Sequence, residues 1–354
     1  MILAAFSLLG LIDLILGGRW GLGAEFEQGV AKMGSIALSM VGFYCIGITF
    51  VQQNAALIAE ETAGMPFDPS MLIALVLCSD MGGLPIAQEL AATPELGIFT
   101  GALVASGMGT LVSFQLPVFL STIPKEHLPT LMRGFVYGIV TLPIGLLVGG
   151  LMLGLPLQTL LVNMMPVLAL CLVLLAGMKW APDGTIRVLT RIGRIVTVFS
   201  YALFALVVIG LFLPQFAIAE QELVEEAAFI ALRAVIIVSG GMVLSHLAVR
   251  FFHGVLDGMS RLLGINYASV MGLILSCPHS MAMVPMYPDM DYRGKIMNAA
   301  FSVCGAYLIG GQLAFVMQLV PASAVPAVLA NKILAGVSAV ALAAWAERGS
   351  KEIV

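Results

Sequence analysis

Charge is scarce in this chain. Only 10% of its 354 residues are charged and 60% are hydrophobic, whereas soluble domains carry about 25% charged residues. A soluble core could not bury so large an apolar fraction behind a polar shell. The five cysteines lie in apolar segments without a CxxC pair, which argues against disulfides and metal ligands. No run of basic residues indicates nucleic acid as a partner.

Familiar chemical motifs are also missing. The chain has no Walker loop, no HExxH and no GxSxG sequence, so we expect no catalytic residue, no metal and no cofactor. What it has instead is a series of long apolar runs along its whole length. These runs predict an all-α protein that crosses a membrane many times.

The apolar runs predict eleven membrane elements. They cover about residues 2–17, 29–52, 71–90, 97–122, 131–154, 158–178, 193–213, 228–250, 268–287, 295–320 and 326–346. Glycine, proline and charged residues mark most of the connections between them.

Loop charge constrains how these elements cross, because cytoplasmic loops are enriched in Lys and Arg. If all eleven crossed once, the basic loops at Lys125 and at Arg187 would lie on opposite faces. The conflict disappears if elements 71–90 and 268–287 enter and return on one side, with the N-terminus outside and the C-terminus inside. Non-helical backbone is tolerated at membrane depth where protein or a wet cavity covers it. We therefore expect both elements to be broken or re-entrant, and single crossings stay open for them.

A weak internal repeat leads to the same arrangement. At an offset of 199 residues, Cys78 aligns with Cys277 and Asp80 with His279. Elements 1 to 5 match elements 7 to 11 in order, which predicts two inverted five-element repeats with a connecting helix. Chance similarity between apolar segments is the alternative. The predicted parts are a first repeat at 1–155, a connecting helix with a basic cytoplasmic loop at 156–186, and a second repeat at 187–354.

The first candidate site is the sequence Cys78-Ser79-Asp80-Met81-Gly82-Gly83. An ionisable side chain inside a bilayer costs about 3 kcal/mol on insertion scales and marks a functional pathway. The two glycines weaken the helix, and the freed backbone carbonyls beside Asp80 would suit a cation. A helix cap is the other role open to Asp80. We predict substrate contacts from Cys78, Ser79, Asp80, Gly82 and Gly83.

The second candidate site is Cys277-Pro278-His279-Ser280, in the aligned element. Pro278 breaks the helix and removes a backbone donor. His279, with Ser280 beside it, could relay a proton or hydrogen-bond a hydroxyl group. A structural histidine held by a neighbouring carbonyl is the alternative.

Other polar residues lie at membrane depth, where amides and hydroxyls commonly hold helices together. Asn298, Gln312 and Ser113 are second-choice ligands among them. Arg233 and Lys332 stand near segment ends, and snorkelling to the interface explains both.

Five motifs occur in order along nearly the whole chain. They are Glu25-Phe26-Glu27-Gln28-Gly29 running into Met33 to Gly42, Cys78 to Gly83 followed by Ala87-Gln88-Glu89-Leu90-Ala91, Gly138 to Gly145, Asn163 to Val167, and Met290 to Lys295. Together they resemble the ethanolamine-utilisation permease family (EutH-like). The resemblance implies a multi-pass inner-membrane protein that moves ethanolamine for use as a carbon and nitrogen source.

The residues agree with a small ammonium alcohol as the substrate. By analogy with lysine, whose pKa is about 10.4, an alkyl amine is mostly protonated at neutral pH and needs a route across hydrocarbon. Asp80 would meet the ammonium group, and His279, Ser79 or Ser280 the hydroxyl group. We expect facilitated diffusion or cation-coupled uptake, with the substrate and the lipid bilayer as partners, and a homo-oligomer stays open. The alternatives are a transporter or channel for another small amine or cation, and a membrane-embedded sensor or enzyme.

Overall fold

The computed structural model describes residues 2–31, 33–62, 64–251 and 253–348. Every regular element in these ranges is helical, and they contain no strand. Six helical segments among them are long and apolar enough to cross a membrane, and a seventh span results if one pair of helices bent by 100° counts as a single span. The expectation of an all-α protein with many membrane crossings is confirmed.

The six long segments belong to the central and C-terminal parts of the chain. They are Pro94–Thr122, Lys125–Met152, Leu157–Trp180, Pro182–Phe212, Gln221–Leu244 and Ala322–Ala346. The first of these contains α6 (Pro94–Ile98), the π-helical stretches η2 (Phe99–Gly109) and η3 (Leu111–Gln115), and α7 (Leu116–Thr122). The others contain α8 (Leu128–Met152), α9 (Leu157–Trp180), α10 (Pro182–Phe212), α11 (Gln221–Phe251) and α16 (Val325–Ala346).

The remaining helices include one of 30 residues, α3 (Met33–Thr62), and several short ones. The short ones are α1 (Ile2–Ile15), α2 (Leu22–Val30), α4 (Ser70–Val76), η1 (Ser79–Gly83), α5 (Leu84–Leu90), α12 (His253–Leu263), α13 (Tyr267–Ser276), η6 (Ser280–Asp289), α14 (Tyr292–Cys304) and α15 (Gly311–Leu319). Three single 3₁₀ turns, η4 (Lys125–His127), η5 (Pro214–Phe216) and η7 (Ala322–Ala324), complete the order.

The basic segment before the seventh predicted element is helical, so its prediction as a loop is wrong. α9 ends at Trp180 and α10 begins at Pro182, which leaves Ala181 as the connection. Proline at the first position of a helix costs no hydrogen bond, and Asp183 in the first turn complements the helix dipole. The arginines at 187, 191 and 194 therefore lie within α10.

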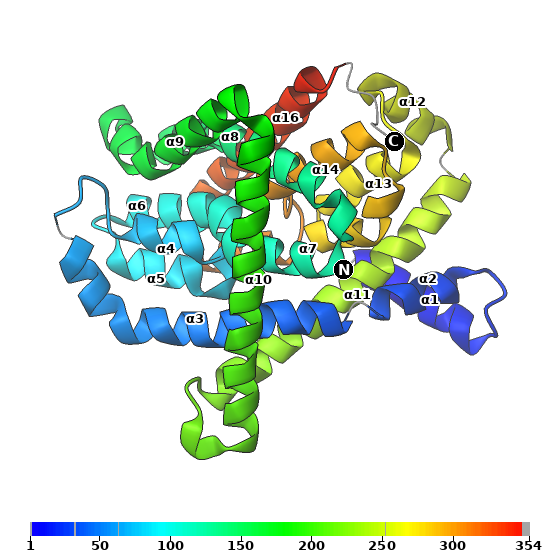
Figure 1. Ribbon diagram of the computed structural model, residues 1–354, viewed down its shortest axis with the longest axis horizontal. Coiled ribbons are helices and arrows are strands. Elements are labelled where there is room, and N and C mark those ends of the chain that lie inside the picture. The colour runs from blue at the N-terminus through cyan, green and yellow to red at the C-terminus, as the bar shows by residue number, and fades with distance from the viewer. Residues whose placement is uncertain (1, 32, 63, 252, 349–354) are drawn as a thin grey trace.

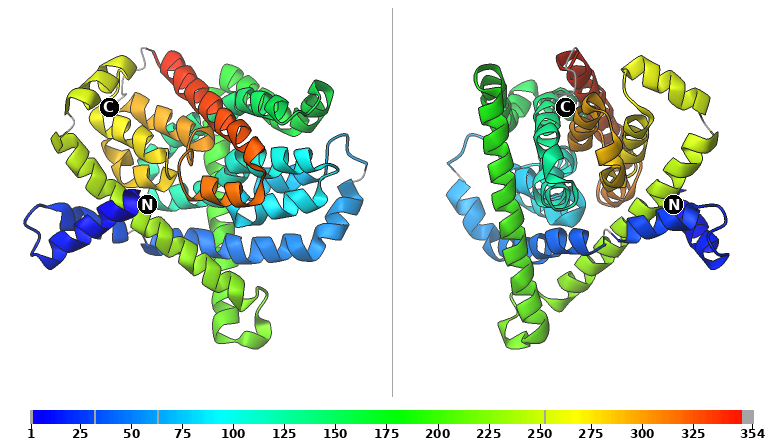
Figure 2. Two further views of the ribbon diagram at one scale, coloured as in Figure 1. Left: turned by 180° about the vertical axis from the view of Figure 1, so that it is seen from behind. Right: turned by 45° about the vertical axis from the view of Figure 1, so that its right-hand side comes forward.

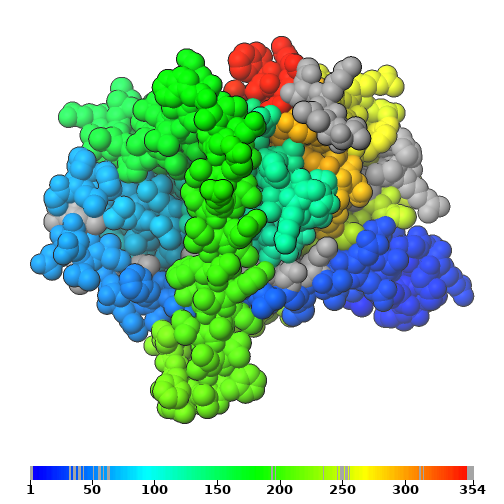
Figure 3. Space-filling view, in the orientation of Figure 1, coloured from blue at the N-terminus to red at the C-terminus, as the bar shows by residue number. Residues whose placement is uncertain are grey.

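The outer surface is strongly apolar. On α9, Leu172 and Val173 are each 68% exposed, and on α10, Val198 is 63% exposed. Figure 3 shows α10 lying across one face of the molecule. Figures 1 and 2 show that the connecting end of α10 and α11 projects from the rest of the molecule. Exposed apolar side chains of this kind suit a lipid environment.

The first broken element, α4–η1–α5, is a hairpin whose two ends meet. The Asp68 carboxylate accepts hydrogen bonds from the backbone N–H of Ser70 at 3.0 Å and from that of Ala92 at 2.9 Å. One side chain therefore links the start of α4 to the residue that follows α5. Figure 1 shows α4 and α5 side by side, and the two helices pack against each other.

The second broken element, α13–η6, closes in a similar way. The backbone N–H of Asn266 donates to the Asp291 carboxylate at 2.9 Å, and the Asn266 amide donates to the carbonyl of Asp289 at 2.8 Å. Asn266 lies 198 residues after Asp68. In each of the two broken elements, the first and the last residues therefore lie close together.

A third break interrupts the predicted element 295–320, so its prediction as one continuous element is wrong. α14 ends at Cys304 and α15 starts at Gly311, and Tyr307 between them has a φ of 63°. Residues of the second break hold this turn. The N–H of Tyr307 donates to the carbonyl of Ser276 at 3.2 Å, and the N–H of Ile309 donates to the carbonyl of Cys277 at 3.1 Å. The carbonyls freed at the end of α13 thus gain partners that a helix would have supplied.

Small residues allow close approach between helices of the two predicted halves. A Cβ atom on Gly42 of α3 would lie 2.7 Å from the carbonyl carbon of Leu203 in α10, and one on Gly240 of α11 would lie 2.7 Å from that of Leu3 in α1. α3 also packs against α11, and α8 against both α14 and α16. Backbones this close need glycine at the contact.

Candidate functional site

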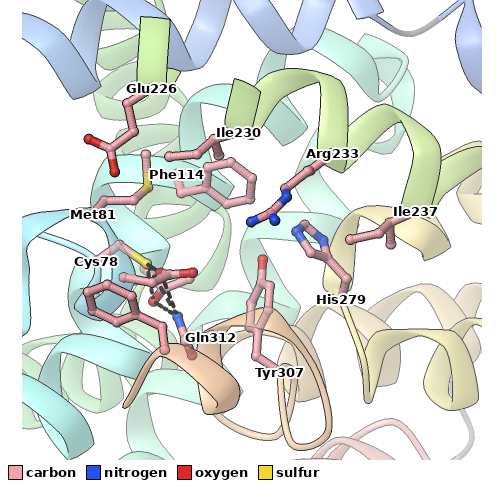
Figure 4. A pocket seen from close by; sticks show the side chains of 13 residues that line it. Cys78, Met81, Phe114, Glu226, Ile230, Arg233, Ile237, His279, Tyr307 and Gln312 are labelled. Atoms are coloured by element: carbon pink, nitrogen blue, oxygen red, sulfur yellow. Dashed lines mark hydrogen bonds between the residues drawn. The ribbon is translucent and has the colours of Figure 1, made fainter. Parts of the chain in front are cut away.

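Polar side chains of the interior surround a cavity of about 190 Å³, to which all three breaks contribute. Cys78, Asp80 and Met81 come from the first break, His279 from the second and Tyr307 from the third. Figure 4 shows Cys78, Met81, His279 and Tyr307 around one space, with α11 on its opposite side. Segments 199 residues apart in the sequence therefore meet at a single site.

The two glycines of the first break both have a structural reason. Met81 and Gly82 have non-helical backbone angles, and Gly82 has a φ of 86°, which a residue with a Cβ adopts only with strain. A Cβ on Gly83 would lie 2.6 Å from the carbonyl oxygen of Leu77. The prediction that these glycines break the helix is confirmed, although neither lines the cavity.

The Asp80 carboxylate is held by side chains. Its Oδ1 atom accepts from the Cys78 thiol at 2.8 Å and from the Gln312 amide at 3.4 Å. Gln312 also donates to the hydroxyl of Thr110 at 3.0 Å. The start of η1 has no side-chain cap. Asp80 is half-buried, and its second oxygen receives no hydrogen bond from the described residues. That oxygen is free to accept a bond from a ligand.

His279 forms the start of η6. Its Nδ1 atom accepts the backbone N–H of Met281 at 3.3 Å. Because Nδ1 is an acceptor, the neutral ring carries its proton on Nε2 and donates from there. The edges of Phe114 and Tyr307 pack around the ring, with centroid distances of 5.9 and 4.9 Å. The imidazole is thus fixed in position, and its Nε2 donor has no hydrogen-bond partner among the described residues.

Ser280 lies behind the cavity wall and fixes Tyr307. The two hydroxyl oxygens are 2.6 Å apart, and the Gln115 amide donates to Ser280 at 3.2 Å and to the carbonyl of Ser302 at 2.7 Å. Ser280 itself does not line the cavity. Its contact orients the aromatic ring that does.

The remaining predicted site residues surround the breaks without lining the cavity. The Ser113 hydroxyl accepts the N–H of Cys78 at 3.0 Å. The Asn298 amide donates to the carbonyls of Ser269 and Gly294 at 2.8 and 2.9 Å, which joins α13 to α14. Ser79 is fully buried, and its hydroxyl has no partner among the described residues. Of the predicted contacts, the cavity therefore brings together Cys78, Asp80, His279 and Gln312.

Sequence reasoning missed the charged face of α11. Glu226 and Arg233 line the cavity beside the breaks, and both point toward it in Figure 4. They are seven residues apart, close to two helical turns, so they share one face. The Arg233 guanidinium also lies 4.4 Å from the ring centroid of Phe229. Arg233 therefore lines the cavity wall and does not snorkel to the membrane interface, as the sequence had suggested.

Comparison with known proteins identifies the family. Residues 1–346 match the family model described as "Ethanolamine utilisation protein, EutH". This chain belongs to the EutH family. A relative from Listeria monocytogenes, named probable ethanolamine permease EutH, is 34% identical over 96% of this chain and 91% of its own length. The uncharacterized protein YxeR of Bacillus subtilis is 32% identical over 97% of this chain and 93% of its own.

A third relative, from Salmonella typhimurium, is also named probable ethanolamine permease EutH and is 29% identical over 91% of this chain and 85% of its own length. No solved structure matches the chain significantly. EutH membership, the permease names of its relatives and the apolar helices identify a multi-pass membrane transport protein, not an enzyme.

The charged side chains that line the cavity of this EutH protein are two carboxylates, Asp80 and Glu226, and one guanidinium, that of Arg233. Among the described residues, no group of three or more His, Cys, Asp or Glu side chains is placed to hold a metal ion. The site offers carboxylate acceptors, one imidazole donor and aromatic faces, which can together hold a small molecule with an ammonium group.

Proposed function

We propose that this protein moves ethanolamine across the bacterial inner membrane, by facilitated diffusion or cation-coupled uptake, and binds it in the cavity between the breaks. The observation that carries the proposal is the convergence of Asp80 and His279, from aligned elements, on one cavity. Discontinuous helices that meet at a central site are a recurrent transporter architecture. The relatives named probable ethanolamine permease support the choice of substrate.

Ethanolamine fits the cavity in charge and size. Its ammonium group would bind the free oxygen of Asp80, with Glu226 as a second carboxylate, and its hydroxyl oxygen would accept the Nε2–H of His279. A cavity of about 150 Å³ in another protein holds benzene, which has six non-hydrogen atoms. Ethanolamine has four, so about 190 Å³ leaves room for accompanying water.

The proposal includes the two inverted repeats, at 1–155 and 187–354, joined by 156–186, with the N-terminus outside. α1 packs on α11 as α10 packs on α3, which is the exchange that a two-fold repeat requires. Gly42 and Gly240, at these two contacts, are 198 residues apart. The closed ends of the hairpins α4–η1–α5 and α13–η6 support their re-entry from the side on which they begin.

Uptake by the purified protein in lipid vesicles tests the function. We expect saturable accumulation of labelled, chemically unchanged ethanolamine that protein-free vesicles do not show. Competition by a panel of amines and metal cations separates ethanolamine from other guests. Absence of uptake, or release of a modified product, would favour a sensor or an enzyme instead.

Replacing His279 with alanine should weaken recognition of the hydroxyl group. Wild-type protein should prefer ethanolamine to ethylamine, which lacks the acceptor for the Nε2–H. Because this preference depends on one hydrogen bond in a half-buried site, we expect the ratio of uptake efficiencies to fall about tenfold in H279A. The matched control is His246→Ala, since His246 lies outside the cavity at 3.3 Å from Glu25. An unchanged ratio in H279A would exclude this role.

A further inference from the structure

Lys332 of α16 is enclosed in the protein core. The residue is 2% exposed, so its interpretation as a snorkelling side chain is wrong. Its ammonium group donates to the backbone carbonyls of Ala306 at 2.9 Å and Ser106 at 3.1 Å. No carboxylate of the described residues forms an ion pair with it. A buried charge is costly unless polar groups surround it, so these two carbonyls are its main compensation.

Both carbonyls belong to backbone that departs from the α-helix. Ala306 lies in the third break, beyond the end of α14, and no backbone N–H of the described residues donates to its carbonyl. Ser106 lies in the π-helical stretch η2. Their neighbours Gly107 and Gly305 are 198 residues apart. The ammonium group therefore joins corresponding segments of the two predicted halves.

The same ammonium group lies behind the wall of the cavity. Its nitrogen is 5.7 Å from the ring centroid of Tyr307. The Tyr307 ring also contacts the ring of His279, and the Tyr307 hydroxyl is hydrogen-bonded to that of Ser280. Backbone carbonyls replace the hydration shell of alkali cations in selective channels, and an aromatic face attracts any cation. The surroundings of the Lys332 ammonium are therefore those of a small monovalent-cation site.

We propose that this is a monovalent-cation site which the Lys332 ammonium occupies permanently, so that uptake at the neighbouring cavity does not draw on Na⁺. A tethered ammonium group holds such a site at a high effective concentration and excludes a free ion. The statement that uptake does not draw on Na⁺ rests on the proposed function. The cation site at Lys332 does not rest on it, because occupancy of that site can be tested without transport.

Thermal melting of purified Lys332→Ala protein tests the site. This substitution removes three carbons and the nitrogen, which n-propylammonium can replace. It takes a donor from two buried carbonyls, and that of Ala306 has no backbone donor among the described residues. We expect a lower melting temperature than wild type. Added Na⁺ or n-propylammonium should raise it by about 3 °C more than in wild type, whereas the bulky cation N-methyl-D-glucamine should not. Lys179→Ala, which removes an exposed lysine at the end of α9, is the control and should show no such gain.

Ion replacement in lipid vesicles tests the consequence. Wild-type uptake of ethanolamine should be equal in Na⁺ and N-methyl-D-glucamine media, whereas K332A uptake should fall about tenfold and recover in part with Na⁺. Dependence of wild-type uptake on Na⁺ would overturn the proposal even if K332A does not fold. A folded K332A protein that melts like wild type, or that gains nothing from either small cation, would also overturn it. If wild type takes up no ethanolamine, the proposed function fails while the melting result still decides the site.

Discussion

Replacing Asp80 with asparagine should lower the efficiency of ethanolamine uptake by about 100-fold, because the variant loses a charge-assisted bond to the ammonium group. The substitution keeps the size and shape of the side chain. The amide oxygen of the new side chain would still accept a bond from the Cys78 thiol, which contacts Oδ1 of Asp80 at 2.8 Å in the wild type. The break should therefore keep its structure while the cavity loses one of its two carboxylates.

Initial uptake rates over a range of ethanolamine concentrations measure this effect. The matched control is Glu89→Gln, which neutralises an exposed carboxylate in the same hairpin outside the cavity. E89Q should transport at the wild-type rate. If D80N inserts normally, migrates as a single species and still transports like wild type, Asp80 does not bind the substrate.

Replacing Gly42 with alanine should prevent normal packing of α3 on α10. The added Cβ would lie 2.7 Å from the carbonyl carbon of Leu203, and backbone cannot move aside as a flexible side chain would. The two helices must separate, and we expect a destabilisation of about 3 kcal/mol. Because α10 and α3 join the two predicted halves, assembly of the whole core should suffer.

The melting temperature of the purified protein in detergent measures this loss. We expect G42A to melt about 5 °C or more below wild type. Gly34→Ala is the control in the same helix, since a Cβ there meets no atom within 4 Å. G34A should be neutral or more stable by about 1 kcal/mol, because alanine favours a helix. Equal melting of G42A and wild type would contradict the close contact between α3 and α10.

The first two breaks were predictable because their signals are local. Gly82 adopts a φ of 86°, and Pro278 cannot continue the hydrogen-bond ladder of α13. Loop charge predicted that these two elements re-enter instead of crossing once. Hydrogen bonds of Asp68 and Asn266 join the two ends of each broken element, and re-entry itself stays a prediction.

The third break was not predictable in the same way. The segment 295–320 is apolar and contains no proline, so hydropathy describes it as one span. Its turn is held by the N–H of Tyr307 and that of Ile309, which donate to carbonyls of another element. Gly310-Gly311 at the start of α15 was the available local signal. The sequence does not show that another element supplies the acceptors for the turn, and Tyr307 was missed for this reason.

The positions of charges along the chain were a poor guide to their surroundings. Lys332 and Arg233 both stand near segment ends in the sequence. Lys332 donates to buried carbonyls, whereas Arg233 lines the cavity. The seven-residue spacing of Glu226 and Arg233 was the available signal for a shared face of α11, but it does not tell which neighbour that face meets.

A structure determined with bound ethanolamine tests the central claim most directly. We predict density for the ligand in the cavity between the breaks, with its nitrogen about 2.8 Å from an Asp80 carboxylate oxygen and its hydroxyl oxygen about 3 Å from Nε2 of His279. Ethanolamine bound at another place, with this cavity filled only by solvent, would contradict it.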